Sequence, residues 1–416
     1  MHRELVISTV DQGLTSAFSL ALSLAFIALA TPEEFGRFAI LQAALMAAHS
    51  LQGPLVLTPT TYLLPGRDKA AQAAQLSMLS SVNAAIVAIA ALLGIATAAA
   101  YVGGTLVVVA TAAMFALAIV REHARTVFFV TGSASQVLLQ DVIYVAVAGA
   151  AIAALWEAAG PFMASLGGMA LASLVSWLLV RPQLHLALGR MGSHLRAYRA
   201  VWRDTRWALL GAVQTEAQNR GYLYITEAWR GAGAVGALQA GRLLLSPLWL
   251  TAGAWGRVAK PAMVAAFHRQ AAADAFRILA AGIAFMVAIT VLYGIVLMLV
   301  WPLVESFIFG ERYGDMSAIV TIWWLYAAVY CVNICLSALA QARLQFRRLA
   351  GLAAIATVAS IGALVLLSTT GLPTTTALYV LLGAELVMLA GLGWTVLQGA
   401  PGFSAPGLEA VTGGNT

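Results

Sequence analysis

The sequence predicts an all-α integral membrane protein with about twelve transmembrane helices. Of its 416 residues, 61% are apolar and 10% are charged, and the mean hydropathy is +0.88. Soluble globular proteins carry roughly 25% charged residues, so this composition excludes a single water-soluble core. A helix needs about 20 predominantly apolar residues to cross the hydrocarbon region. The chain therefore has room for about a dozen crossings and for little else.

Apolar runs follow one another along the chain, six on each side of a basic stretch at 181–206. The runs cover residues 6–30, 38–62, 76–99, 105–120, 127–155 and 162–180, and then 207–228, 234–255, 278–301, 318–339, 350–367 and 375–397. We therefore predict two six-helix bundles, residues 1–180 and 207–398, joined by a basic cytoplasmic linker at 181–206. The Gly/Pro-rich residues 399–416 are predicted to form a disordered cytoplasmic tail.

The positions of the basic residues support both the helix count and an orientation. Short cytoplasmic loops retain Lys and Arg, and with the N-terminus inside almost all loop residues of this kind fall on the cytoplasmic side, Arg121 and Arg125 among them. Only Arg37, Arg230 and Arg312 fall outside, whereas Arg220 and Arg242 lie within apolar runs. A miscounted helix would scatter this pattern. We therefore expect a multi-pass protein with both termini in the cytoplasm.

Several other classes of protein are disfavoured. The lysines, Lys69 and Lys260, lie in no G-x-x-x-x-G-K-[ST] loop, so nucleotide-driven pumping is not expected. Cys331 and Cys335 lie four residues apart on one helix face, which is typical of buried apolar residues rather than a disulfide or a metal pair. The net charge of +6 is concentrated in loops at the membrane surface, so we predict no nucleic-acid partner. We also predict no cofactor and no metal.

Function is expected where polar side chains lie inside apolar runs. A charge near the bilayer centre costs about 2.5–3.5 kcal/mol, so it usually faces protein or a wet cavity. The seventh run carries a polar band that consists of Gln214, Glu216, Gln218, Asn219 and Arg220. Glu216 and Arg220 are spaced i, i+4 with the acid first, the favourable order for a helix pair. A structural ion pair and a role with substrate or proton are both compatible with this spacing.

Three further polar residues lie within the runs. Arg242 has no acid three or four residues away, so its partner must come from another helix or from a ligand. Asp11 lies about 8 Å inside the first helix and either guards an inward-facing mouth or lies near headgroup water. His49, in the second run, is more often a hydrogen-bonded packing residue than a proton relay. Near the outer ends of the helices, Trp323, Trp324 and Tyr326 fit an interfacial aromatic belt better than a sugar-binding platform.

The second helices of the two halves begin with a weak internal similarity. Gly36 and Gly236 occupy corresponding positions, and six residues after them stand Gln42 and Arg242, both polar within apolar runs. Two halves with an even number of crossings would be related by an axis along the membrane normal, as in parallel-repeat transporters.

Short motifs carry a resemblance to a known family. They are the segment Leu-Ala-Thr-Pro-Glu-Glu-Phe-Gly-Arg-Phe-Ala at 29–39, Val10-Asp11-Gln12, Ala240-Gly241-Arg242-Leu243 with Pro247, and Phe309-Gly310-Glu311-Arg312-Tyr313. In their order and their places relative to the twelve runs, these motifs resemble bacterial polysaccharide flippases of the multidrug/oligosaccharidyl-lipid/polysaccharide (MATE-like) exporter superfamily.

The resemblance implies two six-helix bundles, alternating access, and export of a polyprenyl-diphosphate-linked oligosaccharide across the bacterial plasma membrane, with no enzymatic step. Membrane lipids are further ligands that it implies, and a polysaccharide polymerase and glycosyltransferases are partners. The candidate substrate-binding residues are Arg220, Arg242, Gln214, Gln218, Asn219 and Gln42, and the candidates for proton or ion coupling are Glu216, Asp11 and His49. Asp141 and Glu385 are interpreted as isolated acids on helices five and twelve, outside the central helices one, two, seven and eight of the family, and they rank lower.

Two alternatives remain open. The first is a cation-coupled multidrug exporter of the same superfamily, which Arg220 and Arg242 disfavour because a cationic drug would be repelled. The second is a membrane glycosyltransferase or polymerase that acts on the same lipid carriers. Such an enzyme would be expected to bring acids or a metal site in a large polar loop, whereas the longest loop here, 181–206, is basic and carries only Asp204 as an acid.

Overall fold

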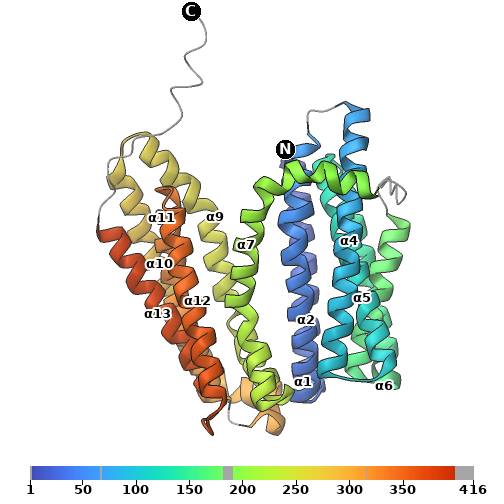
Figure 1. The fold of residues 1–416 in the computed structure, drawn as a ribbon. Helices are drawn as coiled ribbons and strands as arrows, with labels where there is room; N and C mark the ends of the chain where they lie inside the picture. Colours follow the sequence, from blue (N-terminus) through green and yellow to red (C-terminus); the bar gives the residue numbers. More distant parts are fainter. Residues whose placement is uncertain (1, 66–67, 181–190, 315, 399–416) are drawn as a thin grey trace, which may run out of the picture. The chain divides into compact units, whose positions relative to one another are not determined.

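The computed structural model describes residues 2–65, 68–180, 191–314 and 316–398, and all regular structure in these ranges is helical (Figure 1). The elements are α1 (His2–Leu29), α2 (Pro32–Gln52), η1 (Gly53–Leu57), α3 (Thr58–Leu63), α4 (Lys69–Tyr101), α5 (Thr105–Val130), α6 (Ala134–Leu179), α7 (Met191–Arg230), α8 (Ala232–Leu244), α9 (Ser246–His268), α10 (Ala272–Val304), η3 (Glu305–Phe309), η4 (Gly310–Tyr313), α11 (Ser317–Ala342), α12 (Phe346–Ser368) and α13 (Thr375–Leu397). The predicted all-α class is confirmed. The predicted tail at 399–416 and the first part of the predicted linker, 181–190, lie outside the described residues.

Within the described ranges, nine segments are long and apolar enough to cross a membrane. The second half of α6, together with α7 and the pair α8–α9, brings this number to the predicted twelve. α7 is less apolar because it carries the polar band on which the functional predictions rest. α8 has only 13 residues and crosses together with α9. α6 is two crossings in one run, because Gly160 has a non-helical φ of 78° and Pro161 follows it. Glycine reaches this region at little steric cost, and proline lacks the N–H that would continue the helix.

The second crossing shows how local sequence sets its bounds. Thr31 caps α2: its hydroxyl accepts a hydrogen bond from the Glu34 N–H at 3.2 Å, and the Glu34 carboxylate accepts one from the Thr31 N–H at 2.9 Å. This capping box, with Pro32 at the first helical position, fixes the start of the helix. Near its other end the crossing passes through a π-helical turn, η1, which contains Pro54. The missing N–H of Pro54 accounts for the local loss of the α-helical pattern.

The boundary between the fourth and fifth crossings differs from the prediction. The sequence places a cytoplasmic loop at 121–126, whereas α5 continues without a break to Val130 and the turn lies at 131–133. Arg121 and Arg125 are therefore helical residues of α5 and not loop residues. Their charges did not end the helix because acidic side chains of other helices compensate them inside the protein.

By their contacts, the helices fall into two units. Unit 1 consists of Met1–Ala240 and Leu303–Gly314, and unit 2 consists of Gly241–Pro302 and Asp315–Thr416. α7 groups with unit 1 because it packs against α2, α4 and η1. The chain thus passes from one unit to the other inside α8, so the boundary between predicted bundles at 181–206 stays a prediction.

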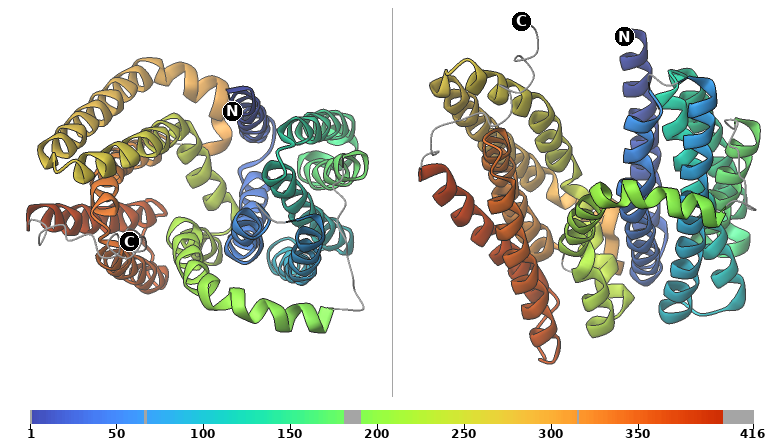
Figure 2. Two further views of the ribbon diagram at one scale, coloured as in Figure 1. Left: turned by 90° about the horizontal axis from the view of Figure 1, so that it is seen from above. Right: turned by 45° about the horizontal axis from the view of Figure 1, so that its top comes forward.

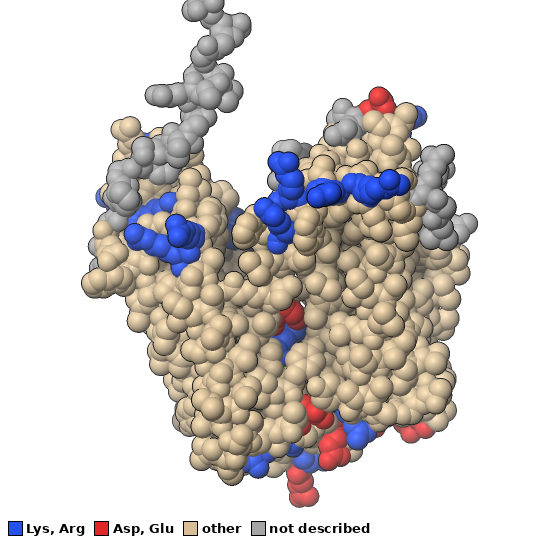
Figure 3. Space-filling view, viewed as in Figure 1, with Lys and Arg blue, Asp and Glu red and all other residues tan. Residues whose placement is uncertain are grey.

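The described part of the predicted linker, 191–206, is not a loop but the first part of α7. This part crosses the ends of neighbouring helices before α7 turns to run alongside α2 (Figures 1 and 2). Tyr198 anchors it by donating a hydrogen bond to the carbonyl of Leu55 at 2.7 Å, and Ser81 Oγ lies 2.7 Å from His194 Nδ1. Its arginines form an exposed basic row, visible in blue in Figure 3, which consists of Arg196, Arg199, Arg203 and Arg206. The segment is therefore a surface helix with one basic and one packed face.

Candidate functional site

A polar cavity of about 190 Å³ lies in unit 1 among α1, α2, α5 and α6. Two of the predicted site residues, Gln42 and His49 of α2, line it together with Arg121, Glu122 and Arg125 of α5. Ionisable side chains inside apolar helices are costly unless they pair or line a wet space. This concentration of them makes the cavity the candidate site of unit 1.

An ion-pair network beside this cavity joins three helices. Arg125 pairs with Asp11 of α1 at 2.9 Å and with Glu122 at 2.8 Å, and its Nε lies 2.9 Å from an oxygen of Asp141 in α6. Arg121 also pairs with Asp141. The side chains of Asp11 and Asp141 are 2% and 0% exposed, so they depend on these two guanidinium groups for compensation. Asp11 is therefore buried against protein in this structure.

The network does not balance its own charge. Asp11, Glu122 and Asp141 bring three carboxylates, and Arg121 and Arg125 bring two guanidinium groups that stay charged. One oxygen of Asp11 accepts no hydrogen bond from any described residue. Buried charge without a partner is costly, so a proton or a small cation taken up by the network would remove this imbalance. Among the described residues no group of three or more His, Cys, Asp and Glu side chains is placed to hold a metal ion.

His49 combines the two roles that its sequence context left open. Its Nδ1 lies 3.3 Å from the side-chain oxygen Oε1 of Gln52, and the Gln52 side-chain Nε2 donates to Asn83 Oδ1 at 2.8 Å and to the main-chain carbonyl of Ile119 at 2.7 Å. Gln52 is fully buried, so this network fixes one side of the imidazole. The ring also lines the cavity that contains Glu122 and Arg125. His49 is therefore held by packing and hydrogen bonds on one side, and its imidazole lines the cavity on the other.

The predicted i, i+4 pair on α7 is formed. Arg220 Nε lies 2.6 Å from Glu216 Oε1, and Ser50 of α2 donates to the other Glu216 oxygen at 3.2 Å. The side chains of Arg220 and Glu216 remain 30% and 17% exposed, so the pair is only partly desolvated. In the same band, Gln214 and Gln218 are half-buried and Asn219 is exposed. α7 therefore carries a partly exposed polar band around its middle.

Unit 2 contains a cluster of aromatic side chains beside two charged ones. The aromatic cluster consists of Trp249 of α9 and of Trp323, Tyr326 and Tyr330 of α11, with ring centroids 4.9–6.3 Å apart. The Arg242 guanidinium lies 5.6 Å from the Trp323 ring centroid, a cation–π distance. On the other side, the Glu385 carboxylate accepts hydrogen bonds from Tyr326 at 3.0 Å and from Asn333 at 2.6 Å.

Two interpretations made from the sequence need correction here. Trp323 is only 1% exposed and packs in the core of unit 2, so it is no part of an interfacial belt. Glu385 is 7% exposed and hydrogen-bonded to α11, so it is not an isolated acid. Asp141, the other low-ranked acid, is central to the network of unit 1. Each acid is paired with residues of another helix, α5 for Asp141 and α11 for Glu385, and spacing along one helix does not reveal such pairs.

The structure gathers the predicted site residues into separate groups. Asp11, Gln42 and His49 lie at or beside the cavity of unit 1, the α7 band lies with Ser50, and Arg242 belongs to unit 2. The sequence analysis missed Arg121, Glu122 and Arg125 as site residues because it ended the fourth helix at 120. Their i, i+3 and i, i+4 spacing would have been the signal, had the run been continued through them.

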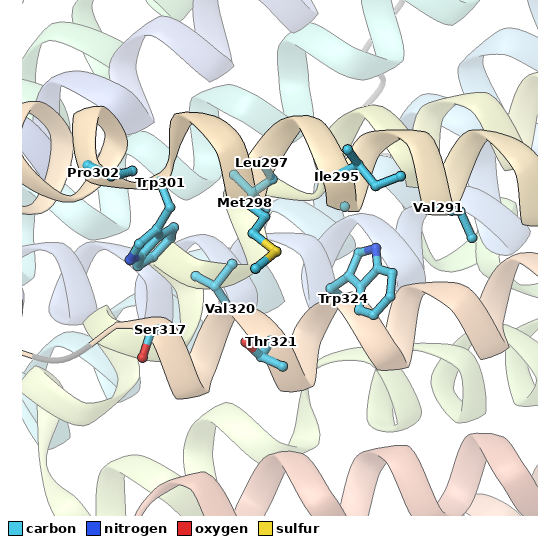
Figure 4. Close-up of a pocket in the computed structure, with 11 residues that line it drawn as sticks. Val291, Ile295, Leu297, Met298, Trp301, Pro302, Ser317, Val320, Thr321 and Trp324 are labelled. Carbon is cyan, nitrogen blue, oxygen red and sulfur yellow. The ribbon is translucent and has the colours of Figure 1, made fainter.

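An apolar groove of about 580 Å³ lies between α10 and α11 in unit 2 (Figure 4). Trp324 of α11 packs directly on α10: its ring lies where a side chain at Gly294 would be, and its Nε1 donates a hydrogen bond to the carbonyl of Thr290 at 3.0 Å. Among the lining residues only Ser317 and Thr321 carry hydroxyl groups. The groove contains none of the predicted site residues.

Comparisons with known proteins bear on the fold. No protein-family model and no curated protein sequence matches the chain. Among solved structures, it is similar to an inward-facing multidrug resistance MATE family transporter of the MOP superfamily, with a TM-score of 0.67 and 15% identity over 95% of this chain and 98% of that one. It is also similar to the lipid II flippase MurJ in an inward closed conformation, with a TM-score of 0.68 and 10% identity over 94% and 87%. A MATE structure in a bent conformation gives a TM-score of 0.58 at 13% identity, over 95% and 94% of the two chains. The predicted MATE-like architecture is therefore confirmed, and identities this low show the fold alone.

Proposed function

We propose that this multi-pass membrane protein of MATE-like fold flips a polyprenyl-diphosphate-linked oligosaccharide across the bacterial plasma membrane by alternating access. The fold is shared with a lipid flippase and with drug exporters, so it supports transport without selecting the cargo. In this proposal both termini are cytoplasmic, the headgroup passes between polar side chains, and the prenyl tail stays in the lipid. A non-enzymatic rearrangement of this kind needs only differential binding to two states.

The observation that carries the choice of cargo is the partly exposed ion pair of α7. Glu216 and Arg220 lie at mid-helix, and Arg220 keeps 30% of its side chain accessible although it is paired. A guanidinium in that setting can donate a planar fork of hydrogen bonds to a diphosphate. Glu216 and Ser50 hold its orientation. An anionic headgroup would gain from Arg220, whereas a cationic drug would be repelled by it.

We assign energy coupling to the network of unit 1. Its excess carboxylate, with Asp11 and Asp141 buried and His49 on the wall of the adjoining cavity, can take up one proton without a new counter-ion. A proton that binds better in one of two conformations shifts the balance between them. The proposed exchange is one inward proton for one outward headgroup.

Transfer in liposomes tests this function directly. Purified full-length protein is reconstituted with a fluorescent polyprenyl-diphosphate-linked trisaccharide, and the label accessible outside is measured over time. We expect transfer well above protein-free liposomes and above liposomes with Arg220→Gln. Folded wild-type protein that moves no more label than empty liposomes would contradict the proposal. The same liposomes loaded with an organic cation test the second candidate, the multidrug exporter, which the acidic network of unit 1 favours.

A further inference from the structure

We propose that the aromatic cluster of unit 2 is a sugar subsite, at which Trp249 and Tyr330 stack on a pyranose ring of the cargo. This inference rests on the proposed function, because it names the part of the glycan headgroup that unit 2 recognises. It concerns residues that the sequence assigned either to an aromatic belt or to no role.

Partial exposure distinguishes this cluster from ordinary core packing. Trp323 is 1% exposed and closes the cluster on the protein side. Trp249, Tyr326 and Tyr330, in contrast, are each only half-buried. Tyr326 and Tyr330 lie in the interior of α11, and Trp249 lies in the first turn of α9, where the crossing continues from α8. Aromatic side chains with polar tips normally settle at the membrane interface. Their place away from the ends of these crossings therefore suits a partner that is apolar on one face and polar at its edge.

The arrangement of the rings leaves flat surface available. Tyr326 and Tyr330 are near-parallel, at 15°, with centroids 6.3 Å apart, because they lie one turn apart on α11. Trp249 meets both of them edge-on, at 67° and 81°. An edge-to-face contact covers at most one face of one of the two rings and leaves the opposite face of that ring uncovered. The C–H face of a pyranose has the matching shape and is apolar, as aromatic stacking requires.

Polar groups next to the rings match the rim of a sugar. Asn333 continues the same face of α11, three residues after Tyr330, and is 5% exposed. Its side-chain oxygen accepts no hydrogen bond from a described residue, and the buried Nε1–H of Trp249 donates none. An unmet buried donor or acceptor costs about 1–3 kcal/mol. Sugar hydroxyl groups both donate and accept hydrogen bonds, so they match the free acceptor on Asn333 and the free donor on Trp249.

The charges near the aromatic cluster favour a sugar over an organic cation as its ligand. An aromatic cage beside a carboxylate is a common way to bind a cation. Here, however, Glu385 is already engaged by Tyr326 and Asn333, and Tyr326 and Tyr330 lie within electrostatic reach of Arg242 as well as Glu385. The two formal charges cancel, so a neutral, hydroxylated ring is favoured over a cation.

Binding of two lipids by the full-length protein in nanodiscs tests the subsite. One is polyprenyl diphosphate that carries a single N-acetylhexosamine, and the other is bare polyprenyl diphosphate. We expect Trp249→Ala and Tyr330→Ala to weaken binding of the sugar-bearing lipid about tenfold, roughly the value of one aromatic contact, and to leave the bare lipid within twofold. Tyr330→Phe, which keeps the ring, should weaken binding of the sugar-bearing lipid less than Tyr330→Ala does. Trp394→Ala, which removes a tryptophan that is 64% exposed on α13, is the control and should bind both lipids like the wild type.

The ratio of the two affinities decides the outcome even if a variant is damaged. A folding defect lowers binding of both lipids together, and an unchanged ratio overturns the subsite. Tetraphenylphosphonium serves as the cation probe. If the wild type binds this cation, Trp249→Ala does not, and binding of the sugar-bearing lipid is the same in both, the sugar subsite is also overturned. The proposed function fails separately, when wild-type protein moves no labelled glycan in liposomes. Transport without a change in the ratio would refute the sugar subsite alone.

Discussion

Gly36 of α2 and Gly236 of α8 face each other where the starts of their helices cross in unit 1. A Cβ atom on Gly36 would collide with the carbonyl group of Ala232, and one on Gly236 would collide with the carbonyl group of Pro32. The contact is reciprocal, since each glycine meets the residue four positions before the other. The weak similarity between the second helices of the two halves therefore has a structural basis: both glycines allow the same close approach.

A side chain at this crossing should separate the helix starts. For Gly236→Val we expect a loss of about 1–3 kcal/mol in the free energy of unfolding, as overpacking produces, together with loss of transport. Thermal unfolding in detergent and the liposome assay measure the two effects. Gly149→Ala is the matched control, because a Cβ there meets nothing within 4 Å. Wild-type stability of Gly236→Val would show that the two helices are not in contact in the protein.

Removal of Arg125 should be among the most damaging single changes. Arg125→Ala leaves the buried carboxylates of Asp11 and Asp141 with one guanidinium fewer, and breaking a buried pair costs about 3–5 kcal/mol. The midpoint of thermal unfolding should fall accordingly. Arg277→Ala serves as control, since its pair with Asp274 is 82% and 47% exposed and is worth about 0–1 kcal/mol. Equal midpoints for the two variants would contradict the network.

The coupling role of Asp11 predicts a change in how transport responds to a proton gradient. In wild-type liposomes, acid on the side to which the headgroup is delivered should accelerate transfer. In Asp11→Asn the amide cannot exchange a proton, so the rate should no longer respond to the gradient. Transfer at several imposed gradients measures this. If the transfer rate of Asp11→Asn responds to the gradient as the wild type does, Asp11 is not the coupling residue.

A double substitution separates the two roles left open for the pair on α7. If Glu216 and Arg220 only stabilise the protein, replacing both by Gln should restore most of the stability that either single change removes. If Arg220 binds the diphosphate, Arg220→Gln and the double variant should both lose transport, whereas Glu216→Gln should lose less. Unfolding midpoints and transfer rates are compared for the four proteins. Full transport by the double variant would leave only the structural role.

The basic row on α7 should make the protein sensitive to lipid charge. Arginines near an anionic surface contribute about 1 kcal/mol each. Replacing Arg196, Arg199, Arg203 and Arg206 by Gln should therefore lower activity in phosphatidylglycerol-rich liposomes and have little effect in phosphatidylcholine. The control replaces Arg257 and Arg269, which are exposed on or just after α9. An equal loss in both lipids would assign the row to protein contacts.

The architecture was accessible from sequence because hydrophobic length and the positions of basic residues depend on single segments. Twelve runs, the break at Gly160 and the partners Glu216 and Arg220 all follow from local spacing. The fourth helix was cut short at 120 because Arg121 and Arg125 resemble loop residues when their partners are unknown. Those partners lie on other helices, Asp11 far upstream on α1 and Asp141 on α6, the next helix after α5.

The candidate sites were predicted only in part, for the same reason. Asp11, Gln42 and His49 were identified as polar residues in apolar runs, and they do gather around one cavity. Which of them meets Arg121 and Glu122 depends on packing between α1, α2 and α5. The aromatic cluster of unit 2 was missed because single aromatic residues such as Trp249 and Tyr330 are common in membrane helices. Only the contact between them, which depends on the packing of α9 against α11, marks them as a cluster.

Unit 1 includes a short piece of chain from far downstream, Leu303–Gly314. In it, Arg312 donates hydrogen bonds to the carbonyls of Ala28 and Ala30 at the end of α1. Ribosomal synthesis reaches Arg312 only after α7, α8, α9 and α10 have been made. The first helix is therefore complete long before the arginine that caps its last carbonyls has been made, and a chain truncated before Arg312 lacks this cap.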